Sequence, residues 1–410
     1  MIDIKLLREN PKLIKEASKN KGAEIDVDEI LKIDEERRRM GLEVQKLQEE
    51  RNKFAKEKNI EKGKEIKEKL EGKEKNLNEL SEKLKQLLLQ IPNPAKPDVK
   101  AGKNDTENDV LRTVGTPKKF NFTPKDHLTI GENLDIIDVK RAAKVSGTRF
   151  YYMKNEGVLL EFALKQLAFE LLMKEEFVPI LPPVLIKEEV MRALGYMENG
   201  GDEDMFVFDK DKLVLVGTSE QSIVPMFKDE IIDGKELPKR FVGFSSCFRR
   251  EAGSYGKDTR GILRVHQFDK VELVSFVKEG EDDKEHEYLL SLEEKLLDLL
   301  EIPYRVVKMC TGDLGFPAAR KYDLEGWVPS ENKYRELTST STTTDFQSRR
   351  LNIKYKEKGE TKFVNILNGT AFSTRPIVAI LENYQQEDGS VKVPNVLEKF
   401  IGKSIIKPKK

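Results

Sequence analysis

The chain has 410 residues, of which 38% are hydrophobic and 36% are charged, and its formal net charge is zero. This length allows two or three domains, and so many charges indicate a long solvated element. The zero net charge excludes a general attraction to nucleic acid, so any basic patch must be local. Two cysteines and three histidines argue against a disulfide framework and a zinc site. Because the N-terminus lacks a signal-peptide core and no apolar run approaches the ~20 residues of a membrane span, we expect a cytoplasmic protein with no membrane partner.

The N-terminal quarter of the chain has a helical pattern. Residues 1 to about 22 are expected to form a short helix that Asn10 and Pro11 interrupt. Beyond it, apolar residues recur at spacings of 3, 4 and 7 in two runs, with charges nearly everywhere else. Such narrow heptad seams are typical of coiled coils, and the break at 58–63 can turn the chain between the runs. The pattern predicts an antiparallel coiled-coil hairpin over about 28–90. Its apolar seams are Ile30, Ile33, Met40, Val44, Leu47 and Phe54, then Ile66, Leu70, Leu77, Leu80, Leu84 and Leu87.

The tip of this hairpin is basic. Residues 51–69 contain eight Lys or Arg and four Glu, a local net charge of +4. Charge on a thin hairpin can serve solubility alone, or it can bind a polyanion through phosphate contacts. The residues by themselves leave both interpretations open.

The hairpin stops near Pro92, and residues 92–126, rich in Pro, Lys, Asp, Asn and Gly, are expected to form a linker or crossing segment. We place a domain boundary near residue 100, giving domains of residues 1–100 and 101–410. In the second domain, strands follow one another with tight turns and only occasional helices. This order predicts an α+β fold, with a mainly antiparallel sheet flanked by helices. The strands are expected in 149–154, 177–186, 305–315, 334–350 and 363–372, and the helices in 157–174, 283–300 and from Pro376 onward. Residues 213–227 are expected to form a strand that runs into a polar turn and then a helix.

The most informative stretch is 247–273, where two extended segments flank a long Gly-rich polar loop. In a strand, Arg249 and Glu251 would share one face, and Arg264, Phe268 and Glu272 would share one in the second segment. The opposite face would be apolar. This polar face would carry two arginines, two carboxylates and an aromatic ring, and a cationic loop would lie above it. Such a face suits a ligand that has phosphates and a planar base. A solvated hairpin with scattered charges would show the same spacing.

From end to end, the chain resembles bacterial-type seryl-tRNA synthetase, a class II aminoacyl-tRNA synthetase. The segment ending at Pro182-Pro183 resembles motif 1, FRRE with its loop and RVHQF resemble motif 2, and NGTAFSTRPIVAILEN resembles motif 3. The resemblance implies that ATP activates L-serine to seryl-adenylate, with release of pyrophosphate. The seryl group then passes to the 3′ end of tRNA(Ser) and, in hosts that have it, tRNA(Sec).

The resemblance also implies site residues. Arg249, Arg375 and Glu336 would be catalytic, with Arg249 on the α-phosphate and serine's carboxylate. Glu336 and Ser339 would hold Mg²⁺, in a sparse, water-rich site of the kind this ion prefers. The ATP site would comprise Arg249, Arg250, Glu251, Arg264, Val265, Phe268, Glu336, Leu337, Thr338, Ser339 and Arg375.

Serine would bind beside ATP. Thr218 and Glu220 match the pair that holds its ammonium group, and Glu272 and Thr370 match the groups around its hydroxyl. A site built to bond a hydroxyl rejects alanine, because its own polar groups would otherwise be buried without partners. The full expected set is Thr218, Ser219, Glu220, Arg249, Glu272 and Thr370.

The resemblance favours the polyanion interpretation of the basic tip, since the family's helical arm reaches across a homodimer to the tRNA on the other subunit. Two alternatives stay open. One is a class II paralogue that loads a non-tRNA carrier, against which the basic arm argues. The other is a non-catalytic tRNA-binding relative, against which Arg249, Glu336, Ser339 and Arg375 together argue.

Overall fold

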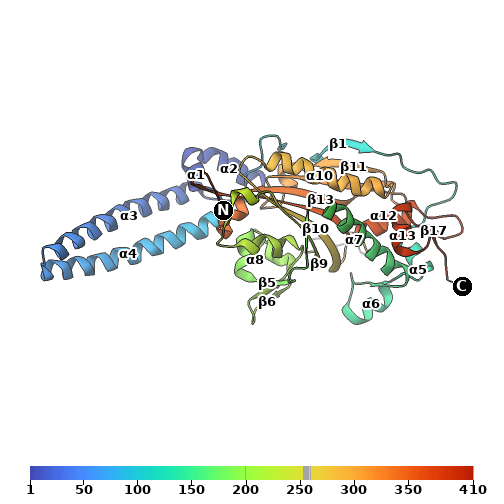
Figure 1. The fold of residues 1–410 in the computed structure, drawn as a ribbon, viewed down its shortest axis with the longest axis horizontal. Helices are drawn as coiled ribbons and strands as arrows, with labels where there is room; N and C mark the ends of the chain where they lie inside the picture. The colour runs from blue at the N-terminus through green and yellow to red at the C-terminus, as the bar shows by residue number, and fades with distance from the viewer. Residues whose placement is uncertain (199, 253–257, 259, 410) are drawn as a thin grey trace. The chain divides into compact units, whose positions relative to one another are not determined.

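The computed structural model of the chain describes residues 1–198, 200–252, 258 and 260–409. It divides into two compact units, Met1–Pro94 and Ala95–Lys410 (Figure 1). Within the described residues, no helix is both long enough and apolar enough to cross a membrane.

The first unit is helical, and its two long helices confirm the predicted hairpin. Helices α3 and α4 run side by side in Figure 1, and each has 30 residues, about 45 Å at 1.5 Å per residue. The side chain of Asn59 caps α4 by accepting a hydrogen bond from the Lys62 N–H at 3.2 Å. The turn is therefore shorter than the expected 58–63. The helices of this unit are α1 (Ile4–Glu9), α2 (Pro11–Asn20), α3 (Val27–Lys56) and α4 (Ile60–Leu89).

The apolar seams are buried unevenly along the hairpin. Ile30 and Leu70 are each 1% exposed, whereas Leu47 and Phe54 are only half-buried. A two-helix hairpin has no third element to cover its seam, so partial exposure follows from its architecture. All eight basic residues of 51–69 are exposed.

The second unit is built on a large twisted sheet with the strand order β1-β11-β12-β13-β16-β10-β9-β4. Neighbouring strands pair antiparallel except β4, which pairs parallel with β9 at one edge. This confirms the predicted mainly antiparallel α+β fold. The eight strands are β1 (Asp109–Val114), β4 (Val178–Ile180), β9 (Lys239–Phe248), β10 (Gln267–Val277), β11 (Tyr304–Lys308), β12 (Arg320–Val328), β13 (Lys333–Thr344) and β16 (Asn365–Ser373).

Smaller elements complete this unit. The helices are α5 (His127–Asn133), α6 (Val139–Ser146), α7 (Glu156–Lys174), α8 (Glu188–Leu194), α9 (Glu220–Ile223), α10 (Asp282–Leu299), α11 (Phe346–Leu351), α12 (Arg375–Asn383) and α13 (Asn395–Ile401). The short strands are β2 (Ile137–Asp138), β3 (Tyr152–Met153), β5 (Leu185–Lys187), β6 (Val207–Phe208), β7 (Leu213–Leu215), β8 (Ile231–Asp233), β14 (Lys354–Glu357), β15 (Glu360–Phe363), β17 (Val391–Lys392) and β18 (Ile405–Ile406).

The central strand β10 separates two hydrophobic cores, because successive side chains point to opposite faces of a sheet. Val271 and Leu273 belong to the core that contains α7 and α10, whereas Val274 and Phe276 belong to the core that contains α8 and α9. The side chains at even-numbered positions of β10 share one face of the sheet. Val274 and Phe276, toward the end of the strand, are apolar, whereas Lys270 and Glu272, nearer its start, are polar.

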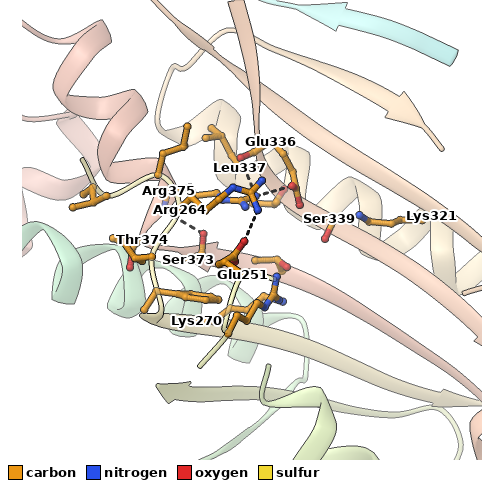
Figure 2. A pocket seen from close by; sticks show the side chains of 17 residues that line it. Glu251, Arg264, Lys270, Lys321, Glu336, Leu337, Ser339, Ser373, Thr374 and Arg375 are labelled. Carbon is orange, nitrogen blue, oxygen red and sulfur yellow. Dashed lines mark hydrogen bonds and ion pairs between the residues drawn. The ribbon is translucent and has the colours of Figure 1, made fainter. Parts of the chain in front are cut away.

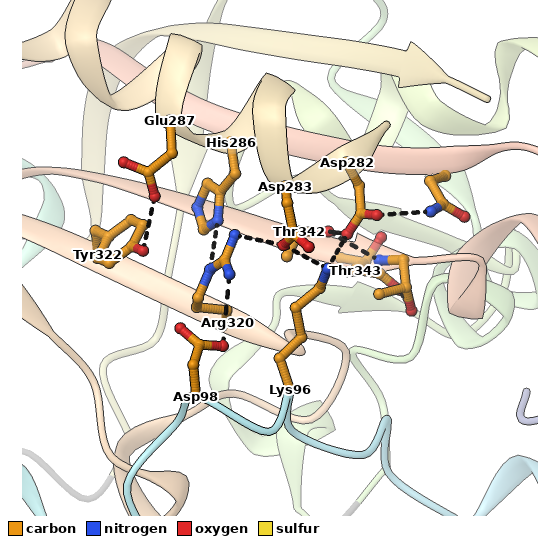
Figure 3. Close-up of polar contacts among 12 residues, drawn as sticks. Lys96, Asp98, Asp282, Asp283, His286, Glu287, Arg320, Tyr322, Thr342 and Thr343 are labelled. Atoms are coloured by element: carbon orange, nitrogen blue, oxygen red, sulfur yellow. Dashed lines mark hydrogen bonds and ion pairs between the residues drawn. The ribbon is translucent and has the colours of Figure 1, made fainter. Parts of the chain in front are cut away.

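Helix α10 is fastened to the sheet by a buried polar cluster around its first turn (Figure 3). Asp282 accepts hydrogen bonds from Thr342 (3.1 Å) and Asn365 (3.0 Å), and it pairs with Lys96 at 2.6 Å. Arg320 on β12 donates through Nε to Nδ1 of His286 at 3.2 Å. Burial and this guanidinium lower the pKa of His286 to about 3, so its ring is neutral and accepts the bond. The cluster fixes α10 against β13 and β16, the strands that carry part of the site.

The structure corrects three local predictions. A strand, β1, lies inside the expected linker of 92–126; most of its side chains are exposed, so no apolar alternation announces it. The strand expected over 149–154 is reduced to β3. In 247–273, β9 ends at Phe248 and β10 begins at Gln267, so Arg249, Glu251 and Arg264 are not strand residues. Glu251 has a left-handed backbone, with φ of 53°, which breaks the alternation assumed for it.

Candidate active site

Two adjoining cavities lie over the polar part of the sheet. The first cavity, of about 160 Å³, is enclosed by the segment before β10, by β13 and by the start of α12. The second cavity, of about 400 Å³, lies between α9, β10, β13 and the segment 315–318. Arg249, Lys270, Lys321 and Ser339 line both, so the two cavities share a boundary. A larger space of about 740 Å³ continues from the first cavity past Arg264 and Arg375.

The first cavity holds two ion pairs (Figure 2). Arg375, at the start of α12, places Nη1 2.7 Å from Oε2 of Glu336. Arg264 forms an ion pair with Glu251 and lies 3.6 Å from Asp258. A guanidinium at a helix N-terminus is repelled by the helix dipole, so Arg375 needs an anion nearby. The carboxylate of Glu336 supplies this anion.

Glu336 is held in its ionised form. Partial burial acts to raise the pKa of its carboxyl, but Arg375 and Lys321 outweigh this effect and the net pKa is lowered. Its side chain remains 38% exposed, toward the cavity. An ionised, accessible carboxylate beside a guanidinium can exchange its partner for a ligand cation.

Arg249 is oriented by the segments around it. Its backbone N–H donates to the carbonyl of His266 at 2.9 Å, and its Nε donates to the carbonyl of Gly217 at 3.2 Å. The guanidinium carbon stands 5.3 Å from the ring centroid of Phe268, close enough for a cation–π contact. The arginine thus points to the boundary of the two cavities, and the ring faces the first.

Glu220 is a buried carboxylate of the second cavity. It accepts hydrogen bonds from Tyr196 Oη at 2.9 and 3.0 Å and from Gln347 Nε2 at 3.0 Å. Burial raises its pKa, which these donors partly offset. Helix α9 can approach β9 this closely because Gly243 has no side chain: a Cβ there would lie 2.3 Å from Ile223.

Glu272, the second buried carboxylate of this cavity, is 1% exposed. Lys270 Nζ lies 2.6 Å from its Oε2, and the Thr370 hydroxyl donates to the same oxygen at 3.4 Å. Burial raises the pKa of Glu272 to about 7, with Lys270 acting in the opposite direction. The same ammonium donates to the Thr218 hydroxyl at 3.3 Å. Lys270 therefore links Glu272, on β10, to Thr218, just before α9.

Most residues expected from the sequence line these cavities. Ser219 does not: its hydroxyl donates to the carbonyl of Gly243 at 3.3 Å, which fixes the start of α9. Arg250 is exposed and stacks over Phe206 at 5.9 Å. Lys257, in the expected cationic loop, lies outside the described residues. Those in the first cavity are Arg249, Glu251, Arg264, Val265, Phe268, Glu336, Leu337, Thr338, Ser339, Thr370 and Arg375, and those in the second include Thr218, Glu220, Arg249 and Glu272.

Sequence reasoning missed Lys270, Lys321, Tyr196 and Gln347. Lys270 could have been found, because it has the same strand parity as Phe268 and Glu272. No motif or spacing in the sequence marks Lys321 as a site residue. Burial acts against its ammonium, but the carboxylates of Asp323 and Glu336 outweigh this and raise its pKa.

The oxygens of the first cavity suit a magnesium ion better than a transition metal. Within the described residues, no group of three or more His, Cys, Asp or Glu could hold a metal. The ionised carboxylate of Glu336 and the hydroxyl of Ser339 line one cavity, and Mg²⁺ commonly takes one or two protein oxygens together with water and phosphate oxygens. The residues present therefore fit that ion.

Family models match the two parts of the chain. Residues 1–95 match the Seryl-tRNA synthetase N-terminal domain, and residues 206–384 match the tRNA synthetase class II core domain (G, H, P, S and T). The fold is thus that of a class II aminoacyl-tRNA synthetase.

Relatives specify the family further. The chain is 44% identical over 426 residues to the serine–tRNA ligase of Dictyoglomus thermophilum, covering all of both chains. It is 45% identical over 420 residues to that of Thermobifida fusca, covering 100% of this chain and 99% of the relative. The solved seryl-tRNA synthetase of Pyrococcus horikoshii, complexed with ATP, has a TM-score of 0.94 at 40% identity, with full coverage of both chains. The chain therefore belongs to the seryl-tRNA synthetase family.

Proposed function

We propose that the chain is a serine–tRNA ligase in which the second cavity binds L-serine and the first binds ATP. The observation that carries this assignment is the shared boundary of the cavities, where Arg249 and Lys270 stand. Serine's carboxylate and the α-phosphate would meet there. Two anions can approach each other only where fixed cations offset their repulsion.

In the activation step, a carboxylate oxygen of serine attacks the α-phosphorus while the bond to the β-phosphate bridging oxygen breaks and pyrophosphate leaves. The nucleophile is already ionised, so no side chain has to take a proton from it. The work of the protein is to align the reactants and to stabilise charge on the phosphate oxygens. The guanidinium of Arg249, fixed by Gly217 and Phe268, is placed for both tasks. In the second step, a hydroxyl of the terminal ribose of the tRNA attacks the seryl carbonyl carbon, and AMP leaves.

The nucleotide would be held between the two arms of motif 2 and the start of α12. Phe268 would stack on adenine and Glu251 would contact its amino end, while Arg264 and Arg375 would exchange their present carboxylate partners for phosphate oxygens. Glu336 and Ser339 would hold Mg²⁺. The bound ion would supply positive charge to the phosphate oxygens of ATP.

The protein would recognise serine through its ammonium group and its hydroxyl. Glu220 and Thr218 would accept from the ammonium group, and Glu272 would accept from the hydroxyl, with Thr370 beside it. Because both carboxylates are buried among fixed protein donors, a ligand lacking its ammonium or its hydroxyl would forgo a hydrogen bond that serine makes. This explains how so small an amino acid is selected.

We propose a homodimer formed through α7 and the edge strand β4. Four large apolar side chains in these elements and in the residue that follows β4 are well exposed: Phe162 (60%), Met173 (54%), Val178 (53%) and Leu181 (77%). Apolar side chains gathered on one face favour a protein interface, and a second copy is the partner that the family implies.

The helical hairpin would bind tRNA(Ser), and tRNA(Sec) where the host has it, through the exposed basic residues of 51–69. Recognition would depend on shape and backbone phosphates, and hence on salt. A cytoplasmic location agrees with the two free, buried cysteines, Cys247 and Cys310.

The test is serine-dependent exchange of pyrophosphate into ATP, followed by charging of tRNA. Arg249→Ala should abolish exchange, whereas Arg141→Ala, whose side chain is 74% exposed on α6, should retain it. No exchange by the unmodified enzyme with serine and Mg²⁺ would refute the activity. Exchange without tRNA charging would favour a ligase that loads another carrier.

A further inference from the structure

Arg350, on α11, is an arginine outside the two cavities whose side chain is fully buried. Its side chain is 0% exposed. The guanidinium carbon lies 4.4 Å from the ring centroid of Phe346 and 5.5 Å from that of Phe316. Nη1 donates to the carbonyl of Arg192 at 3.0 Å and to Oε1 of Glu198 at 3.2 Å. One side chain thus contacts three segments that are far apart in sequence.

Two of those segments are walls of the second cavity. Gly315, Pro317 and Ala318 line it on either side of Phe316, and Tyr196 lines it two residues before Glu198. Arg350 is not among the residues that line the second cavity, but it contacts both wall segments, at Phe316 in one and at Glu198 in the other.

Helix α11 also reaches the site directly. Gln347, one turn before Arg350, donates to Glu220 at 3.0 Å and to the Leu194 carbonyl at 3.4 Å. Residues three apart share a helix face, so both side chains point toward the segment 194–198. Gly195 permits this packing: its φ is +88°, and a Cβ there would lie 3.0 Å from the Phe346 ring and 3.6 Å from Nη1 of Arg350.

We propose that Arg350 is a positioning residue that fixes the width of the amino-acid cavity and thereby its selectivity for serine. This inference rests on the serine site proposed above. A planar guanidinium can pack against aromatic rings while its edge donates to a carbonyl and a carboxylate. Lysine would keep the charge but lose the planar contact and the fork of donors.

The decisive variant is Arg350→Lys, with Arg349→Lys as the matched control. Arg349 is its neighbour on α11, but it pairs with Asp345 at 2.7 Å and stacks over Phe363, away from the cavity. We expect Arg350→Lys to lower kcat/KM for serine in pyrophosphate exchange by about 10- to 100-fold, as misplaced contacts commonly do. The KM for ATP should change less than about twofold, and exchange with threonine relative to serine should rise. Arg349→Lys should leave all three unchanged.

A second variant tests the same inference in case Arg350→Lys does not fold. Arg350→Met with Glu198→Gln removes both members of the buried pair, so no charge is left without a partner. If this double variant is folded by circular dichroism, it should show the same selective loss toward serine. Equal losses for serine and ATP, or an unchanged serine-to-threonine ratio in a folded variant, would overturn the inference. Failure of the unmodified enzyme to activate serine would instead refute the proposed site itself.

Discussion

Replacing Lys270 with methionine tests whether the buried pair of Lys270 and Glu272 sets the charge of the amino-acid site. The side chain that remains is apolar and of similar length, so the main loss is an ammonium 2.6 Å from the Glu272 carboxylate. With its partner present, burial already raises the pKa of Glu272 to about 7. Serine's hydroxyl would donate to the ionised form, so wild-type activity should rise with pH through about 7.

The size of the effect follows from the pair. Removing one member of a buried ion pair costs about 3–5 kcal/mol, and one pKa unit corresponds to about 1.4 kcal/mol. A cost of about 3 kcal/mol corresponds to about two pKa units, so the pKa of Glu272 in the variant would rise from about 7 to about 9. At pH 7.5, the ionised fraction would fall from about three quarters to about 3%, a loss of about 25-fold in kcat/KM for serine.

The assay is pyrophosphate exchange between pH 6 and 9.5, with the variant compared with the wild type at each pH. Because high pH restores the ionised carboxylate, the ratio of variant to wild type should climb as pH rises. A ratio that stays low and constant at every pH would show that the loss comes from the charge of the ammonium at the boundary of the cavities and not from the ionisation of Glu272, and the reasoning about Glu272 would be wrong.

Three further predictions concern the metal, the arm and the dimer. Glu336→Gln should raise the Mg²⁺ concentration for half-maximal exchange by about tenfold or more, a loss of about 1.4 kcal/mol of binding; an unchanged requirement would place the ion elsewhere. Replacing the four exposed lysines at 53, 56, 58 and 64 with glutamine should spare exchange but weaken tRNA binding, with the salt slope reduced by about 3 in a filter-binding titration. An unchanged slope would mean that the tip does not touch phosphates. Leu181→Asp should shift the sedimentation of the enzyme from dimer to monomer, because a buried unpaired charge costs several kcal/mol; a dimer that persists would exclude the β4 edge.

The sequence predicted elements that have a strong period and missed features that depend on backbone geometry. The heptad seams located α3 and α4, since a two-helix hairpin depends on that period alone. Strand β1 was not predicted, because it joins the sheet through its backbone and exposes most of its side chains. The ends of β9 and β10 were placed too near the loop, because the left-handed turn at Glu251 has no glycine to mark it.

The site shows the same division. Residues in recognisable motifs, such as Arg249 and Glu336, could be named in advance. Their partners could not, since Tyr196 and Gln347 reach Glu220 only through tertiary packing. Ser219 was assigned to the ligand because it stands between two cavity residues, yet its hydroxyl donates to the carbonyl of Gly243 instead.

The ion pairs of Glu336 with Arg375 and of Glu251 with Arg264 have one more implication. Each ligand cation or anion that enters must separate a pair, and it can satisfy only one of the two released charges. A nucleotide arriving without a metal would satisfy Arg375 and strand Glu336, whereas a metal alone would do the reverse. The complete metal–nucleotide complex proposed above would satisfy both Arg375 and Glu336 at once. If ATP binds as proposed, these two ion pairs would disfavour a nucleotide without its metal and a metal without its nucleotide.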